Sequence, residues 1–522
     1  QGQVSAGVGG TGLCVTGAIT GAEYALVPFN GAPATDAAFD VAVTGTAAAG
    51  ALTSLIATSA PSLDLTSEAL GGGPASYPRT GTFEARLRTT ERTALPGLMP
   101  GARTWMRTRS TTHATLDAIP ATVAVGQLLR LNANANVACG SPIYHAGRVV
   151  AISNRAIVVA DTANPAGGYT DAEYASFGTT FDTLIDPLDR QAFGDPSDID
   201  GNGRVVVFFT KTVNDLTPAT SASYIGGFFF ARDLFPAQST TEYDGCVGSN
   251  VGEMFYVMVP DPTRGGAFAK ANVGSEVYGT LVHEYQHLIN ASRRMYVNTS
   301  AAAFEESWLD EGLAHMAEEL LFYRVAGLQP RQDIDPVAIR ASETVRSAFN
   351  DYASANFGRY EQYLLAPSAY SPYADNDSLA TRGASWAFLR YAADHKASSD
   401  GTIWHDLVNS TTTGLANLQN VFGSGIMGEL RNWGVSDLTD DLAGVDAAYQ
   451  QPSWNFRAMF AALENTGVFP IADVSLVPGT HHVTLVRGAN AYLRFTVPAG
   501  GSASLQWPTA PSTVQFSLVR TK

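Results

Sequence analysis

The stretch SEVYGTLVHEYQHLIN, residues 275–290, repeats its apolar residues at intervals of three and four. The repeating residues are Val277, Leu281, Val282, Tyr285, Leu288 and Ile289. Because residues three and four apart share one face of an α-helix, this spacing predicts a helix. On that helix His283 and His287, at i and i+4, lie one above the other, and Glu284 follows the first of them.

Two imidazoles at this spacing can hold one metal ion, and an adjacent carboxylate can act on the water that the ion binds. The pattern His-Glu-x-x-His therefore predicts His283 and His287 as zinc ligands and Glu284 as a general base. A third histidine shortly after the motif is excluded, because LINASRRMY follows His287. The third protein ligand that a catalytic zinc needs must come from elsewhere in the chain.

A second helix rich in carboxylates is predicted for FEESWLDEGLAHMAEEL, residues 304–320. Glu311 lies 24 residues after His287, which is far enough for the chain to turn and bring this helix alongside the first. Gly312 and Ala314 are small and would allow close approach. Glu306 is the competing candidate, with 18 residues between it and His287.

A resemblance to known peptidases bears on this choice. The separation of Glu306 from His287 matches that in the aminopeptidase N family, but WLDEGLA (308–314) is similar to that family's WL-x-EG-x-A segment and aligns Glu311 with the ligand. Together with HEYQHLINAS, it resembles the gluzincin class of zinc metallopeptidases, in particular the hyicolysin-like family of secreted bacterial proteases. The likeness extends over roughly residues 140–400, through GDPSDIDGNGRVVVFFT, GEMFYVMVPDP and RGASWAFLRYAAD.

The resemblance implies an exported endopeptidase that acts on polypeptides. Zinc would be held by His283, His287 and Glu311, and Glu284 would accept the proton of the attacking water and pass it to the leaving amine. The second donor to the developing oxyanion is left open among His315, Tyr363, Tyr370, Tyr373 and His405.

The residues around the third ligand depart from the thermolysin-like pattern. Thermolysin-like enzymes carry an aspartate four residues after the ligand glutamate, where this chain has His315. Glu318, one helical turn further, is the alternative for orienting an imidazole. Glu305, Glu306 and Asp310 are interpreted as acidic residues that favour the N-terminus of the helix.

A second, calcium-binding site is suggested by DIDGNGRV, residues 198–205. Asp198, Asp200 and Asn202 stand at positions 1, 3 and 5 of an EF-hand-type loop with glycine at position 6, and Asp195 is a further candidate ligand. Position 12 is Phe209 instead of glutamate, so the full motif is absent. The alternative is a polar turn in which these side chains cap their own backbone.

A run of strand-like segments followed by a run of helical segments predicts a multidomain α+β protein. We expect an N-terminal antiparallel β module at 1–60, a linker or extended connection at 61–115, a zinc metallopeptidase domain at 116–465 and a C-terminal β module at 466–522. Within the metallopeptidase domain, strands are expected to about residue 265 and helices after it.

The composition excludes some classes of partner. The net charge of -16 and the pI near 4.9 disfavour nucleic acids and anionic membrane surfaces, and no run of about 18 apolar residues is present for a membrane span. The three cysteines, Cys14, Cys139 and Cys246, leave every pairing and the unpaired state open. The start at Gln1, without a leader, is what a secreted protein shows after signal removal, and a chain trimmed for another reason would look the same.

Two other functions remain alternatives. One is a secreted binding or adhesion protein with a degenerate or structural zinc site, against which the intact Glu284 argues. The other is an aminopeptidase, against which the missing Gly-x-Met-Glu-Asn motif argues. The sequence carries no signal for side-chain preference or oligomeric state, and the remaining histidines are interpreted as ordinary polar residues: His113, His145, His395, His481 and His482.

Overall fold

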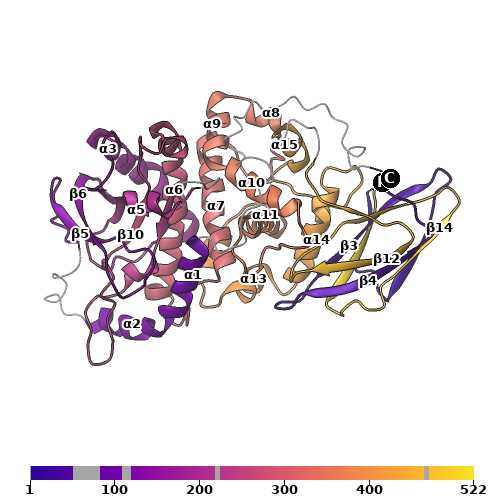
Figure 1. Cartoon of the computed structure of the whole chain (residues 1–522), viewed down its shortest axis with the longest axis horizontal. Helices are drawn as coiled ribbons and strands as arrows, with labels where there is room; N and C mark the ends of the chain where they lie inside the picture. The colour runs from indigo at the N-terminus through magenta and orange to yellow at the C-terminus, as the bar shows by residue number, and fades with distance from the viewer. Residues whose placement is uncertain (1, 51–82, 109–118, 218–223, 464–468) are drawn as a thin grey trace. The chain divides into compact units, whose positions relative to one another are not determined.

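The structure is a computed structural model that describes residues 2–50, 83–108, 119–217, 224–463 and 469–522. The described residues form two compact units (Figure 1). Unit 1 comprises Gln1–Leu70, Tyr323–Asp400 and Leu418–Lys522, and unit 2 comprises Gly71–Phe322 and Gly401–Asn417. Both units combine helices with strands, so the predicted multidomain α+β class is confirmed.

A six-stranded mixed sheet lies at the centre of unit 2. Its strands, in spatial order, are β5 (Leu128–Asn132), β6 (Tyr144–Ile152), β7 (Ala156–Asp161), β8 (Val205–Phe209), β10 (Met254–Val257) and β9 (Gly227–Phe229). Strands β7, β8 and β10 run parallel, and the other neighbours are antiparallel. The sequence VVVFF of β8 is buried throughout, as expected of a central strand covered on both faces.

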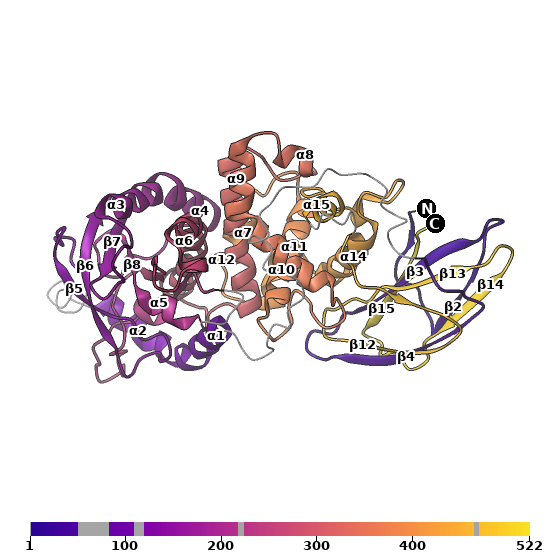
Figure 2. The same cartoon turned by 45° about the horizontal axis from the view of Figure 1, so that its top comes forward.

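One face of this sheet is covered by helices. Figure 2 shows α3 (Asp171–Thr180), α4 (Asp186–Phe193) and α6 (Lys270–Ser292) on that face. Helix α6 contains the predicted helical stretch 275–290, and its second half is buried on nearly all sides against β9, β10 and α4. The histidine motif therefore lies in the interior of unit 2.

Part of the expected linker is helical. Residues 83–108 form α1 (Phe83–Ala94) and α2 (Met99–Thr108), whereas 61–82 and 109–115 lie outside the described residues. The buried apolar residues Phe83, Leu87, Leu95 and Met99 explain the difference, because they follow a spacing of four or its multiple. The other helices of unit 2 are α5 (Lys211–Leu216) and α12 (Ile403–Val408).

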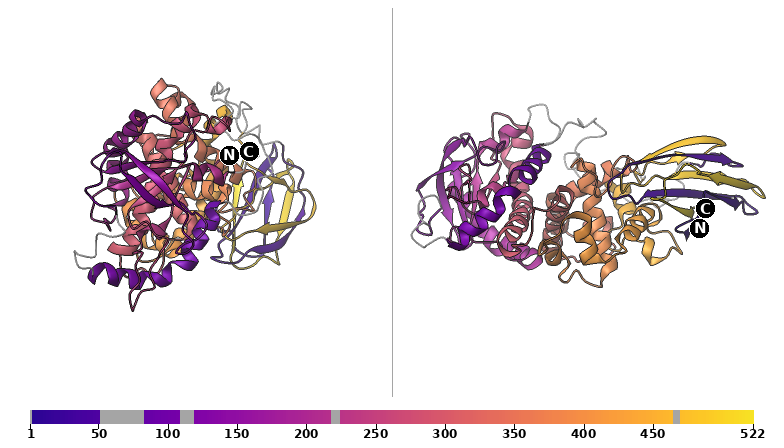
Figure 3. Two further views of the ribbon diagram at one scale, coloured as in Figure 1. Left: turned by 60° about the vertical axis from the view of Figure 1, so that its left-hand side comes forward. Right: turned by 90° about the horizontal axis from the view of Figure 1, so that it is seen from below.

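Unit 1 contains a β-sandwich built from both ends of the chain. One sheet has the order β1 (Gln3–Ser5), β15 (Val514–Arg520), β3 (Ala22–Asn30), β13 (Leu493–Val497) and β11 (Val474–Ser475). The other has the order β12 (Gly479–Leu485), β4 (Ala37–Thr44), β14 (Ser502–Gln506) and β2 (Gly12–Thr16). Figure 3 shows the indigo N-terminal and yellow C-terminal strands side by side.

The two terminal β segments, expected as separate modules at 1–60 and 466–522, thus share their sheets. The physical reason is burial, since a few strands from one end alone cannot cover their apolar face. Strand β4 alternates buried and exposed residues, and its inward Phe39 and Val41 join a core that includes Val483 and Leu505 from the C-terminal strands. Trp507 stacks on Phe516 at 4.1 Å between ring centroids within the same core.

The later helices belong with this sandwich. They are α8 (Pro336–Ile339), α9 (Glu343–Tyr352), α10 (Ser354–Leu364), α11 (Leu379–Lys396), α14 (Ile426–Thr439) and α15 (Phe456–Leu463). Hydrogen bonds connect them to strand segments, for example from the Tyr492 hydroxyl to Gly434 O at 2.8 Å. The expected single domain at 116–465 is therefore divided between the units, with α7 (Ser307–Ala326) and α13 (Gly414–Phe422) spanning the divisions.

A disulfide joins two loops of unit 2. Cys139, after β5, is bonded to Cys246, before β10, and Cys14 is exposed and not in a disulfide. The structure thus selects one of the pairings that the sequence left open. Among the helices of the described residues, none combines the length and the apolar character needed to cross a bilayer.

Candidate metal centre

Two helices of unit 2 bring the three predicted ligands together. Helix α6 carries His283 and His287, and α7 carries Glu311. The two Nε2 atoms are 3.2 Å apart. Glu311 Oε2 lies 3.5 Å from Nε2 of His283 and 3.7 Å from Nε2 of His287. The three potential ligand atoms therefore form a small triangle, close enough together to bind one metal ion.

The size of this triangle fits a zinc ion. Zinc bonds of about 2.0–2.1 Å in a tetrahedral arrangement place neighbouring ligand atoms about 3.3–3.4 Å apart. The observed separations of 3.2, 3.5 and 3.7 Å bracket that value. Two imidazoles and one carboxylate are also a donor set that leaves the fourth position of a catalytic zinc open. The residues present therefore fit the ion.

The opposite ring nitrogens are held by carboxylates. Nδ1 of His283 donates to Glu318 Oε1 at 2.8 Å, and Nδ1 of His287 donates to Asp310 Oδ2 at 2.9 Å. A proton on Nδ1 leaves Nε2 with a lone pair for a metal ion. Glu318 thus has the contact suggested from the sequence, whereas the sequence indicates for Asp310 only a charge near a helix N-terminus and not its contact with His287.

Glu318 lies between two imidazoles. Its Oε1 is also 3.2 Å from Nδ1 of His315, whose ring lies 4.9 Å from that of His283 between centroids. These three residues form a second group able to hold a metal. The 2.8 Å separation of Glu318 from His283 is a hydrogen-bond distance, shorter than the spacing of two zinc ligands, which favours the orienting role.

The electrostatic environment attracts positive charge. Burial opposes protonation of His283, but its hydrogen bonds with Glu311 and Glu318 outweigh that effect and raise its pKa to about 10. Burial likewise opposes ionisation of Asp310, yet the charges of His287 and Arg88 lower its pKa. The carboxylates around the triangle are thus arranged to stabilise a cation between the helices.

Glu284 is buried and faces the sheet. Its Oε2 accepts a hydrogen bond from Phe229 N, on the edge strand β9, at 2.7 Å. Strand β9 approaches α6 closely because Gly227 has no side chain. A Cβ there would lie 2.6 Å from Thr280 Cγ2 and 2.7 Å from Tyr256 O. The predicted base, one residue after His283, is therefore held against the edge of the sheet.

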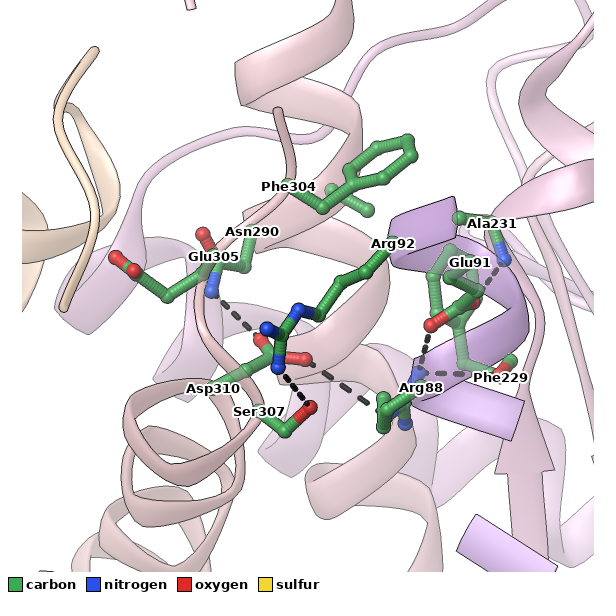
Figure 4. Close-up of a pocket in the computed structure, with 11 residues that line it drawn as sticks. Arg88, Glu91, Arg92, Phe229, Ala231, Asn290, Phe304, Glu305, Ser307 and Asp310 are labelled. Atoms are coloured by element: carbon green, nitrogen blue, oxygen red, sulfur yellow. Dashed lines mark hydrogen bonds and ion pairs between the residues drawn. The ribbon is translucent and has the colours of Figure 1, made fainter. Parts of the chain in front are cut away.

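Helix α1 adds residues that sequence reasoning missed. Arg88 and Glu91 are buried, and Arg88 Nε lies 3.2 Å from Glu311 Oε1. Figure 4 shows both residues beside a small pocket next to the ligand helices. The spacing of Phe83, Leu87 and Leu95 could have predicted the helix, but no local signal placed its polar residues against residues more than 200 positions later.

The other acidic residues before α7 have separate partners. Glu306 Oε2 accepts from Trp308 Nε1 at 2.7 Å, and Glu306 joins none of the metal-competent groups within the described residues. Glu305 is buried rather than solvated, with hydrogen bonds from Gly414 N at 2.7 Å and Asn417 Nδ2 at 2.8 Å and an ion pair with Arg294. Besides its predicted place near the N-terminus of α7, Glu305 therefore has buried partners that the sequence does not indicate.

The candidate oxyanion donors are scattered. His315 is buried against His283, and His405 lies near Arg293, with 3.5 Å between Nε2 and Nη2. Tyr363, Tyr370 and Tyr373 belong to unit 1, where the Tyr373 hydroxyl donates to Ala32 O at 3.0 Å.

Four of the histidines interpreted as ordinary polar residues have hydrogen-bond partners. Nδ1 of His145 lies 2.6 Å from Asp161 Oδ2, and Nδ1 of His482 lies 2.9 Å from Asp40 Oδ1. Nε2 of His395 and of His481 contact backbone carbonyl oxygens at 3.0 and 2.8 Å. The fifth, His113, lies outside the described residues.

The candidate calcium loop is rearranged relative to expectation. Carboxylate oxygens of Asp198, Asp200 and the buried Glu253 lie within 4.8 Å of one another. Asp195 instead pairs with Arg190 at 2.8 Å. Asn202 turns inward and donates to Ile119 O at 3.0 Å.

Hydrogen bonds within the loop match the alternative of a polar turn. Asp198 Oδ1 accepts from Gly203 N at 3.2 Å, Asp200 Oδ1 accepts from Asn202 N at 3.0 Å, and Asn202 Oδ1 accepts from Arg204 N at 2.7 Å. Burial, followed by the charge of Glu253, raises the pKa of Asp200 to about 8. Burial also raises the pKa of Glu253 to about 7.

One comparison with known proteins points to the same chemistry as this geometry. A stretch of 151 residues, 29% of the chain, is 35% identical to the neutral metalloprotease ShpI of Staphylococcus hyicus. Part of the chain is similar to a metalloprotease. The match covers 31% of the length of that relative, so the activity of the whole chain remains a proposal. No protein-family model matches the chain.

Proposed function

We propose that the chain is a zinc-dependent endopeptidase of the gluzincin type, with His283, His287 and Glu311 as zinc ligands. The observation that carries the proposal is the triangle of two Nε2 atoms and one Oε2 atom, with sides of 3.2, 3.5 and 3.7 Å. The similarity to a neutral metalloprotease supports the same assignment.

In the proposed hydrolysis of a peptide bond, each residue of the centre has a separate role. When bound, zinc supplies Lewis-acid polarisation of the scissile carbonyl and lowers the pKa of a water molecule towards about 7. Glu284 accepts the proton of the attacking water and delivers it to the leaving amine. Its hydrogen bond from Phe229 N fixes the carboxylate beside the edge strand β9. Asp310 and Glu318 keep both imidazoles in the tautomer that binds metal.

An exported location is part of the proposal. The disulfide between Cys139 and Cys246 supports it, because such bonds persist in oxidising compartments and are rare in the cytosol. We also retain calcium as a structural ion near Asp198, Asp200 and Glu253, with carboxylate oxygens as the ligands that calcium prefers. Such a cation would offset the mutual repulsion of these carboxylates.

The test is cleavage of an unfolded protein such as casein by the zinc-loaded chain and by Glu284→Gln. The proposal expects the parent to cleave casein and the variant to lose at least about 100-fold in rate, because general acid–base catalysis contributes 10²–10⁴-fold. Both proteins should bind one zinc, because Glu284 is not a ligand in this arrangement. Zinc content is measured on both to separate loss of the base from loss of the metal.

Three outcomes would redirect the proposal. Zinc binding without cleavage by the parent would favour the alternative of a binding protein with a structural zinc. Cleavage only of peptides with a free N-terminus, and not of acetylated ones, would favour an aminopeptidase. A parent that binds no zinc would overturn the metal centre itself.

A further inference from the structure

The two carboxylate oxygens of Glu311 face different partners. Oε2 points toward Nε2 of His283 and of His287, at 3.5 and 3.7 Å. Oε1 lies 3.2 Å from Nε of Arg88, a side chain 5% exposed on helix α1. The orientation of the proposed ligand is therefore set from the side opposite the histidines by a guanidinium from a distant part of the sequence.

The same guanidinium contacts the other parts of the centre. Its Nε is 3.9 Å from Oδ2 of Asp310, the carboxylate that holds His287. Its Nη1 donates to Phe229 O at 3.5 Å, and the N–H of Phe229 holds Glu284. Arg88 thus lies at the junction of the ligand helix α7 and the edge strand β9, as Figure 4 shows.

Glu91 fixes the far side of Arg88. Its Oε2 accepts from Arg88 Nη1 at 2.8 Å, and its Oε1 accepts from Ala231 N at 2.6 Å. A planar guanidinium can direct Nε and Nη1 to two carboxylates at once, whereas a lysine ammonium supplies one compact charge. The pair Arg88–Glu91 therefore sets both the position and the angle of the group that faces Glu311.

We propose that Arg88 is a positioning residue of the metal centre, which holds Glu311 so that only Oε2 is presented to the ion. This inference rests on the proposed function. Without the guanidinium, the carboxylate loses the contact of its Oε1 with Arg88, and its terminal torsion, which has only a weak intrinsic preference, is less constrained. Outer partners of metal ligands are worth 10–100-fold in metal affinity or activity.

The experiment compares full-length variants for zinc binding and for catalysis. The test variants are Arg88→Met, Arg88→Lys and the double variant Arg88→Met/Glu91→Gln, which removes both charges of the buried pair. The matched control is Arg92→Met, one helical turn along, because Arg92 is exposed and its Nη1 donates to Ser307 Oγ at 3.4 Å. The zinc dissociation constant is measured by chelator competition, the melting temperature on the metal-free chain, and kcat and KM on an internally cleaved peptide.

We expect zinc to bind about 10–100-fold more weakly to Arg88→Met and to the double variant, with Arg88→Lys between them and the parent. The value of kcat should fall more than KM rises, and Arg92→Met should match the parent within about twofold. If Arg88→Met does not fold, the double variant and Arg88→Lys decide the outcome.

Zinc affinity and kcat within twofold of the parent in the folded Arg88 variants would overturn the positioning role, and so would a rise in activity, which would mark α1 as a cover over the centre. A parent that binds zinc but cleaves nothing would count against the proposed peptidase activity alone, because the affinity comparison still tests Arg88. A parent without zinc would overturn both proposals.

Discussion

Asp310 bonds two residues of the same helix, one turn apart. Its Oδ2 accepts from Nδ1 of His287 at 2.9 Å, and its Oδ1 accepts from Nδ2 of Asn290 at 2.6 Å. A carboxylate from α7 is therefore hydrogen-bonded to α6 at the position of a proposed ligand. The contact fixes the tautomer of His287 and aligns the two helices.

The substitution Asp310→Asn should weaken zinc binding about 10–100-fold, because a neutral amide holds the imidazole proton less strongly than a carboxylate. Zinc affinity by chelator competition provides the measurement. As a control, Glu343→Gln changes an exposed carboxylate that pairs with Arg346 in α9 and should leave affinity unchanged. Equal affinities in both variants would show that Asp310 has no orienting role.

The third ligand can be decided between Glu311 and Glu306. Glu311→Gln should abolish stoichiometric zinc binding, since it removes one of the three charged or imidazole donors in the triangle. Glu306→Gln should retain zinc, because this side chain accepts from Trp308 Nε1 at 2.7 Å instead. Metal analysis after dialysis against a weak chelator distinguishes the two. The reverse result would restore Glu306 as the ligand.

Removing the disulfide should destabilise the fold. The bond joins residues 107 positions apart, and a loop of that length corresponds to about 4–5 kcal/mol of loop-closure entropy in the unfolded chain. The double variant Cys139→Ala/Cys246→Ala should therefore unfold at a lower denaturant concentration, measured by fluorescence. Cys14→Ala, at the exposed unpaired cysteine, serves as the control and should unfold like the parent. Coincident curves for all three would contradict the prediction.

The candidate calcium loop around Asp198 and Asp200 predicts that calcium stabilises the fold to an extent that depends on pH. In the metal-free fold the pKa of Glu253 is raised to about 7 and that of Asp200 to about 8, above the values of about 4 expected in the unfolded chain. The folded state therefore binds more protons between about pH 4 and pH 8, and stability contributed by these groups declines as the pH rises through that window. Calcium replaces those protons, so its stabilising effect should be larger at pH 8 than at pH 5.

Melting temperatures with and without millimolar calcium at the two pH values measure this effect. Asp200→Asn should lose most of the calcium response, whereas Asp195→Asn should keep it, because Asp195 pairs with Arg190 away from the group. A calcium response that is equal at both pH values, or that persists in Asp200→Asn, would favour a simple polar turn.

The spacing of apolar residues in the sequence predicts much of the candidate metal site. The helix that carries His283, Glu284 and His287 follows from apolar residues three and four apart, and the helix with Glu311 follows the same pattern. The contact of Glu318 with His283 could be suggested as a further helical turn beyond Glu311. The roles of Asp310 and Arg88 could not be predicted from the sequence. Acidic and basic residues near helix ends are common, and the partners of these two residues lie on other elements.

For the fold, too, the sequence predicts individual elements but not how distant elements pair. Alternation in the segments of β4 and β12 predicted strands, and these two strands pair antiparallel, with Phe39 opposite Val483. That both ends of the chain build one sandwich was not predicted, because alternation marks a strand's buried face but not the strand that will pair with it. The linker expected at 61–115 is wrong at 83–108, because the Gly and Pro residues before α1 favour an extended connection only locally, whereas Phe83, Leu87 and Leu95 follow helical spacing.

By itself, the sequence determined the local periodicities of this protein: the helix of the histidine motif, the acidic helix after it, and strands such as β4, β8 and β12. These depend on side chains within a few residues of one another. The tertiary structure alone decided which distant groups meet, including Arg88 with Glu311, Glu253 with Asp200 and Cys139 with Cys246. Such contacts depend on how complete helices and strands pack to bury apolar surface, and that packing selects one partner among many with equal local chemistry.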